Sequence, residues 1–180
     1  MRPLPLSEII SAVGGSLDTE GSEDLIVTGI STDSRKVEPG ELFIPLSGDR
    51  FDGHEFIQGA FKQGALASLA SRDVPLEPGR CVVRVADTLA ALEALALCQR
   101  QELDFEVTAI TGSVGKTTTK EFLRDILGSE CAVAAAPKSF NNRLGVSLTL
   151  LEADEETRHL VVEMLSLIHI SEPTRPLYIS

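Results

Sequence analysis

The first half of the chain alternates short helical and strand-like patterns of apolar residues. Apolar side chains share one face between Leu6 and Val13, which predicts a helix that the glycine pair 14–15 ends. The same spacing predicts two further helices, over residues 55–63 and 88–101. Runs rich in β-branched and apolar residues predict strands over residues 25–30, 41–46, 65–70 and 81–86. The segment SGDRFDGHEF, residues 47–56, is typical of a loop because it combines two glycines with polar turn formers.

The second half alternates more regularly. Strands are predicted over residues 105–111, 131–136 and 159–164, and helices over residues 120–128 and from residue 146. Because strand and helix alternate, we expect a parallel sheet with right-handed crossovers. The fold class is therefore α/β. Its expected parts are a small N-terminal α/β domain over residues 1–86, a linker helix over residues 87–104, and the first βαβ units of a second domain over residues 105–164.

Composition and charge narrow the classes of partner. The 180 residues include 27 acidic and 16 basic side chains, which gives a net charge of −11. This excludes a broad basic surface for nucleic acid, but a few backbone N–H groups and one or two cations suffice to bind an anionic ligand. The three cysteines form no CxxC pair, which favours reduced thiols in a cytoplasmic protein. No apolar run approaches the ~20 residues of a membrane span, and the N-terminus does not resemble a secretory signal.

The segment ITGSVGKTTTKE, residues 110–121, carries the strongest candidate chemistry. A buried strand leads into a glycine-containing turn and then a helix, so the N–H groups of the turn and of the helix N-terminus favour phosphate oxygens. The pattern is the short GxxGK[ST] form, since Ile110 stands where the longer form has glycine. The alternative is an ordinary βα turn with a solvated lysine. The predicted nucleotide-binding residues of this loop are Gly112, Ser113, Val114, Gly115, Lys116, Thr117 and Thr118.

Two further elements could contribute to the same site. Glu163 ends a predicted strand, where a carboxylate beside a phosphate loop can hold or orient Mg²⁺. The segment SFNNRLG offers two side-chain amides; we assign Asn142 to the nucleotide and leave the role of Asn141 open. The alternatives are a solvated carboxylate at a strand end and a pair of turn-forming asparagines.

Together these motifs resemble the Mur ligases of bacterial cell-wall synthesis, over about Leu6 to Met164. TDSRKVEPGELFIPLSGDRFDGHEF looks like their UDP-sugar-binding domain and TGSVGKTTTKE like their ATP loop. SFNNRLGVSLTLL and VVEM look like the next two elements of their ATPase domain. Lys120-Glu121, the asparagine pair and Met164 point to the branch that adds D-alanyl-D-alanine to UDP-N-acetylmuramoyl-tripeptide.

The resemblance implies a P-loop ATPase domain that uses ATP and Mg²⁺. ATP converts a peptide carboxylate into an acyl phosphate, and an incoming amine then displaces phosphate to form an amide. In this scheme Lys116 is catalytic, while Thr117 and Glu163 bind the metal.

The resemblance also assigns residues 1–86 to the UDP-sugar. It places three residues near that ligand, namely Asp33, Ser34 and Arg35. The alternative for these three is a capped turn with a solvated arginine. No catalytic role is expected for His54.

The expected partners are UDP-N-acetylmuramoyl-tripeptide and D-alanyl-D-alanine, and the expected state is a monomer. Three other functions stay open. They are the Mur ligase that adds the third peptide residue, a generic P-loop kinase or ATPase, and a nucleotide-sugar-binding module without activity.

The final 16 residues depart from the family pattern. After Met164 the chain reads LSLIHISEPTRPLYIS, in which LSLIHISEPTR resembles the conceptual translation of a transposase adapter used in sequencing libraries. We therefore expect residues 165–180 to be foreign to the gene, with a divergent C-terminus as the alternative. We also expect the 180-residue chain to be inactive by itself.

Overall fold

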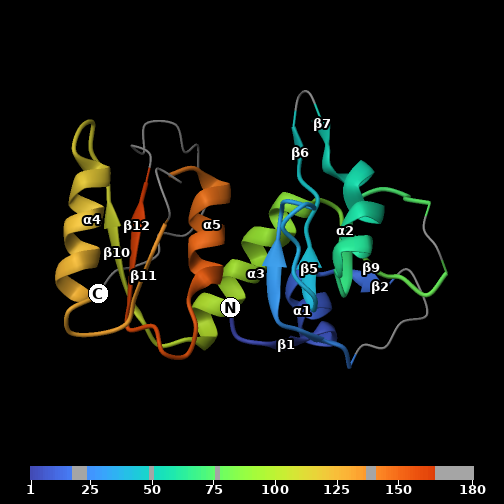
Figure 1. The fold of residues 1–180 in the computed structure, drawn as a ribbon, viewed down its shortest axis with the longest axis horizontal. Helices are drawn as coiled ribbons and strands as arrows, with labels where there is room; N and C mark the ends of the chain where they lie inside the picture. Colours follow the sequence, from blue (N-terminus) through green and yellow to red (C-terminus); the bar gives the residue numbers. More distant parts are fainter. Residues whose placement is uncertain (18–23, 49–50, 76–77, 137–140, 165–180) are drawn as a thin grey trace. The chain divides into compact units, whose positions relative to one another are not determined.

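The computed structural model describes residues 1–17, 24–48, 51–75, 78–136 and 141–164. The chain divides into two compact units between Gln99 and Arg100, and each unit carries its own sheet with helices packed against it (Figure 1). The α/β class predicted from the sequence is confirmed. The suspected foreign tail lies outside the described residues, so its origin stays a prediction. None of the described helices is long and apolar enough to cross a membrane.

The first unit is built on a five-stranded sheet in the order β2-β9-β8-β5-β4. These strands are β2 (Ser16–Leu17), β4 (Gly29–Ser31), β5 (Glu41–Phe43), β8 (Ala67–Ala70) and β9 (Cys81–Arg84). Strands β4, β5, β8 and β9 run parallel, and β2 pairs with β9 in the opposite direction. The helical elements are α1 (Leu6–Val13), the short 3-10 helix η1 (Gly53–Phe56), α2 (Ile57–Gln63) and α3 (Thr88–Glu102), which crosses the division between the units.

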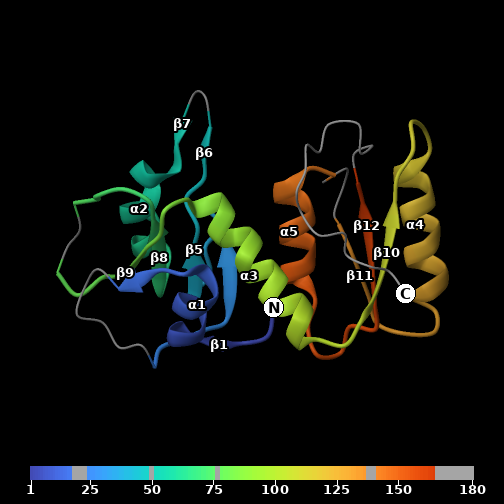
Figure 2. The ribbon, with the colours of Figure 1, turned by 180° about the vertical axis from the view of Figure 1, so that it is seen from behind.

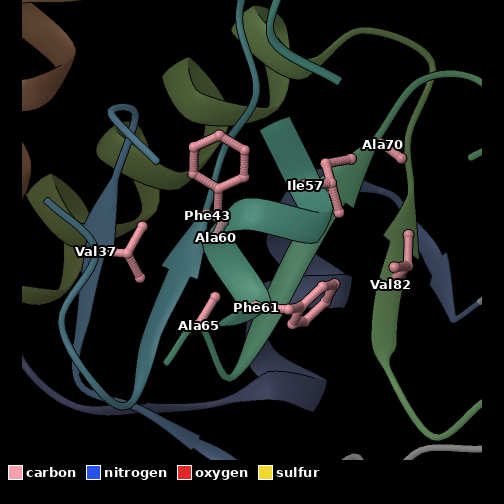
Figure 3. Packing of buried hydrophobic residues seen from close by; sticks show 8 residues of the cluster. All are labelled: Val37, Phe43, Ile57, Ala60, Phe61, Ala65, Ala70 and Val82. Carbon is pink, nitrogen blue, oxygen red and sulfur yellow. The ribbon is translucent and has the colours of Figure 1, made fainter. Parts of the chain in front are cut away.

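Helix α2 supplies much of the apolar core of this unit. Ile57, Ala60 and Phe61 lie three and four residues apart, so they share one helical face. They are buried with Phe43 of β5 and Val82 of β9, as Figure 3 shows. The other members of this core are Val37, Ala65 and Ala70.

Two predictions for the first unit are wrong in detail. The strand expected over residues 25–30 is two strands that join different sheets: β3 (Ile26–Val27) pairs with β1 (Leu4–Pro5), and β4 joins the five-stranded sheet. Thr28 separates them, because its N–H donates to the carbonyl oxygen of Gly40 at 3.0 Å. The expected loop over residues 47–56 contains the paired strands β6 (Ser47–Gly48) and β7 (Phe51–Asp52), followed by η1.

The second unit has a three-stranded parallel sheet, as the alternation of strand and helix predicted. Its strands are β10 (Glu106–Ile110), β11 (Val133–Ala135) and β12 (His159–Glu163), and the order β10-β12-β11 makes β12 the central strand. Helices α4 (Lys116–Leu127) and α5 (Arg143–Glu152) lie on either side of these strands in both Figure 1 and Figure 2. Both helices begin earlier than predicted, so α4 includes the lysine and threonines of the glycine loop.

Candidate functional site

The glycine loop joins the end of β10 to the start of α4, which is the arrangement that phosphate binding requires. Gly112 and Gly115 have φ angles of +148° and +82°, a region that side chains with a Cβ rarely adopt. Gly115 is the N-cap of α4, so the first N–H groups of this helix have no intrahelical partner and face the loop. Ser113 and Val114 form the exposed outer turn between the glycines, and Thr118 is exposed on the first turn of the helix.

Lys116, the first residue of α4, folds back over the loop. Its Nζ donates a hydrogen bond to the carbonyl oxygen of Gly112 at 2.7 Å. An ammonium group has three N–H bonds, so this contact leaves donors for phosphate oxygens. The same contact holds the charge above the turn, where the helix dipole also favours an anion.

Glu163, at the end of β12, lies beside this loop. It is opposite Ile110 in the register of the two strands, and its side chain is only 2% exposed. One carboxylate oxygen accepts from Thr117 Oγ1 at 3.0 Å, and the other accepts from Asn141 Nδ2 at 3.1 Å. The strand ladder and the helix start therefore bring together the two predicted metal ligands, which are 46 residues apart in the sequence.

The charge of this corner suits a divalent cation. Both hydrogen-bond donors to Glu163 are neutral, and within the described part of the chain no lysine or arginine pairs with its carboxylate. An ionised carboxylate is costly to bury without compensating charge. A hydroxyl and a carboxylate are also the hard oxygen ligands that Mg²⁺ prefers, so the residues fit this metal.

The two asparagines take different places. Asn142 is the N-cap of α5, where its Oδ1 accepts from the N–H of Gly145 at 2.8 Å. Asn141 contacts Glu163 directly. The sequence prediction assigned Asn142 to the nucleotide and left Asn141 open, and the structure adds Asn141 to the site. An N-cap asparagine before a helix starting at Arg143 was the signal that could have separated the two.

Asp33, Ser34 and Arg35 lie in the first unit, in a turn that follows β4. Arg35 donates from Nε and Nη2 to the two carboxylate oxygens of Asp33 at 2.9 and 2.8 Å. These side-chain hydrogen bonds lower the pKa of Asp33 to about 2. Both partners are accessible to solvent, so the pair forms an exposed fork that a polar ligand can reach.

His54 is buried among polar groups of the first unit. Its Nε2 accepts the N–H of Ser71 at 3.0 Å, and its Nδ1 lies 2.6 Å from Asp52 Oδ1. A backbone N–H can only donate, so Nε2 is the unprotonated nitrogen and Nδ1 carries the proton. A hydrogen bond from the backbone N–H of His54 lowers the pKa of Asp52 to about 2. These contacts connect η1 to the segment after β8, so His54 has a structural role.

Comparison with known proteins yields two family profiles and several relatives. Residues 26–100 match the profile "Mur ligase family, catalytic domain", and residues 110–175 match "Mur ligase middle domain". The UDP-N-acetylmuramoyl-tripeptide–D-alanyl-D-alanine ligase of Bacillus subtilis is 43% identical over 160 residues, which cover 88% of this chain and 35% of that protein. The middle-domain match continues past Met164 into the suspected tail.

Solved structures of MurF ligases share the fold. The crystal structure of MurF from Acinetobacter baumannii superposes with a TM-score of 0.84 at 33% identity, covering 92% of this chain and 36% of that one. The MurF ligase of Thermotoga maritima in complex with ADP gives a TM-score of 0.67 at 33% identity, covering 76% of this chain and 32% of that one. The chain thus spans about a third of the length of the proteins it matches.

Proposed function

The chain belongs to the Mur ligase family, and on that premise we propose that it is part of an ATP-dependent ligase that joins D-alanyl-D-alanine to UDP-N-acetylmuramoyl-tripeptide. The observation that carries this proposal is the 43% identity, over 88% of the chain, to the Bacillus subtilis protein of that name. The polar corner formed by Thr117, Asn141 and Glu163 supports it, because a ligase that forms an acyl phosphate must hold ATP with its metal.

Phosphoryl transfer depends on positioning and charge neutralisation more than on covalent chemistry by the protein. In the proposed reaction, the N–H groups at the start of α4 bind the phosphates, and Lys116 balances charge on the β- and γ-phosphates. Thr117 and Glu163 would hold Mg²⁺, which neutralises phosphate charge when bound. The solved relative in complex with ADP supports ATP as the co-substrate.

The first unit is proposed to bind the UDP-sugar end of the peptide substrate. Asp33, Ser34 and Arg35 are the proposed contacts, since their exposed turn presents a carboxylate, a hydroxyl and a guanidinium together. We further propose a monomer that works in the cytoplasm. In support, the three cysteines, all within the described residues, form no disulfide.

The test is ADP release by the complete protein that contains this segment, with ATP and Mg²⁺ present. Release that requires both UDP-N-acetylmuramoyl-tripeptide and D-alanyl-D-alanine is the expected result. Release with UDP-N-acetylmuramoyl-dipeptide and a single amino acid would instead identify the ligase of the preceding step. ATP hydrolysis that ignores both substrates would indicate a generic ATPase, and nucleotide-sugar binding without hydrolysis would indicate a binding module.

A further inference from the structure

Helix α4 turns a lysine inward and its aromatic residue outward. Lys120 is 0% exposed and is the only buried residue of this helix, all of which the structure describes. Phe122 and Ile126 on the same helix are 63% and 64% exposed. An amphipathic helix normally buries its apolar stripe, so this placement of a lysine is unusual.

The contacts of the buried amine include two within the described part of the chain. Nζ of Lys120 donates to the carbonyl oxygen of Ala136 at 2.7 Å and lies 3.2 Å from Oε1 of Glu121. The Glu121 side chain is 38% exposed, so water can solvate its carboxylate when the lysine is replaced. A methionine could therefore fill this space, and packing alone does not account for a lysine here.

The contact with Ala136 links helix α4, which carries Thr117, to the end of β11, which is the neighbour of the strand that carries Glu163. Thr117 lies one turn before Lys120 on α4, about 4.5 Å along the helix axis. Ala136 directly follows β11, whose Ala135 pairs with Val161 of β12, the strand that ends in Glu163. Lys120 thus ties the helix that carries Thr117 to the sheet that carries Glu163.

We propose that Lys120 is a positioning residue for the magnesium and phosphate site. By anchoring α4 to the end of β11, it holds Thr117 Oγ1 at hydrogen-bond distance from the Glu163 carboxylate, so that both oxygens face one cation. This inference rests on the proposed function, since it concerns the same metal. In this proposal Lys120 acts through the position of Thr117 and not by binding the substrate.

The experiment compares Lys120→Met with Arg124→Met in the complete protein. Arg124 lies one turn further on the same helix, is exposed and also pairs with Glu121. Its replacement therefore removes a cation beside Glu121 but leaves the hydrogen bond from Lys120 to Ala136 in place. Mn²⁺ binding in the presence of ADP is measured by electron paramagnetic resonance without peptide substrates, and the melting temperature is measured alongside. Residues that orient metal ligands typically change metal affinity 10–100-fold, so we expect Lys120→Met to weaken Mn²⁺ binding by at least ~10-fold and Arg124→Met by less than ~2-fold.

Unchanged Mn²⁺ affinity in Lys120→Met, or an equal loss in Arg124→Met, would overturn the proposal. If Lys120→Met does not fold, Mn²⁺ binding is measured with Lys120→Gln instead, whose amide can still donate a hydrogen bond inside the protein. Its shorter side chain should also weaken the anchor to Ala136, so a loss of Mn²⁺ affinity is again expected. Failure of both variants to fold would also overturn it, since the lysine would then serve folding alone. The binding assay needs no ligation, so a wild-type protein that binds Mn²⁺ and ADP but does not use D-alanyl-D-alanine would refute only the proposed substrate.

Discussion

Lys116 holds its ammonium group above the glycine loop, where we propose that it binds phosphate. Lys116→Ala should lower the rate of ADP formation by the complete protein ~100-fold, because losing one preorganised charge-stabilising donor typically costs about 3 kcal/mol in the transition state. The control is Lys62→Ala, an exposed lysine in the last turn of α2, which should leave the rate unchanged. A rate for Lys116→Ala within a few-fold of wild type would show that this loop is not the phosphate site.

The Asp33–Arg35 pair gives a second prediction for single residues. Arg35→Met should raise the pKa of Asp33 from about 2 towards its ordinary value of 3.8, because the two hydrogen bonds to the carboxylate are lost. Since the folded pKa is the lower one, the stabilisation by this pair is complete above about pH 4 and is lost as the pH falls towards 2. Carbon-13 NMR titration of the carboxyl group measures the shift.

Lys36→Met is the matched control for this titration. The Lys36 side chain lowers the pKa of Asp33 only through its charge and is the smallest contributor, so its removal should move the pKa less than Arg35→Met does. Equal shifts in the two variants would contradict the assignment to hydrogen bonding. The exposed pair should have little effect on overall stability in either case.

Replacing a glycine should have opposite effects on stability in a turn and in a helix of the first unit. Gly40, at the start of β5, has a φ of +93°, and a Cβ there would lie 2.7 Å from Thr28 Oγ1. Gly59, within α2, has no heavy atom within 4 Å of the position its Cβ would take. Gly40→Ala should therefore lower the free energy of unfolding by about 1–3 kcal/mol, whereas Gly59→Ala should raise it by about 0.5–1 kcal/mol. Urea denaturation measures the change in the free energy of unfolding for each variant. A change of the same sign in both variants would contradict the prediction.

Some boundaries of individual helices and strands could be predicted from sequence patterns, and others could not. Helices α1 and α2 end at the predicted glycines, Gly14 and Gly64, because a backbone with positive φ terminates a helix locally. The apolar pattern over residues 25–30 could not show that this segment forms two strands in two different sheets. That division depends on the hydrogen bond between Thr28 and Gly40, two residues that only the folded chain brings together.

For the whole molecule, the decisive fact is that the chain spans about a third of the length of its relatives. The purified 180-residue chain should show no ADP release with both peptide substrates present, because ligation requires three substrates held with reacting atoms ~3–3.5 Å apart. The complete protein under the same conditions is the positive control. Turnover by the short chain comparable to that of the complete protein would refute this expectation.

The sequence by itself determined the α/β class and the parallel sheet of the second unit. It also predicted the glycine turn between β10 and α4, since strand, glycine turn and helix start are all local features. Only the tertiary structure decided which side chains meet at the end of β12. Glu163 joins Thr117 and Asn141 because strand pairing brings distant segments together, and no periodicity encodes that contact. The burial of Lys120 was likewise not predictable from the spacing of apolar residues in α4. It results from how α4 packs against β11 and β12.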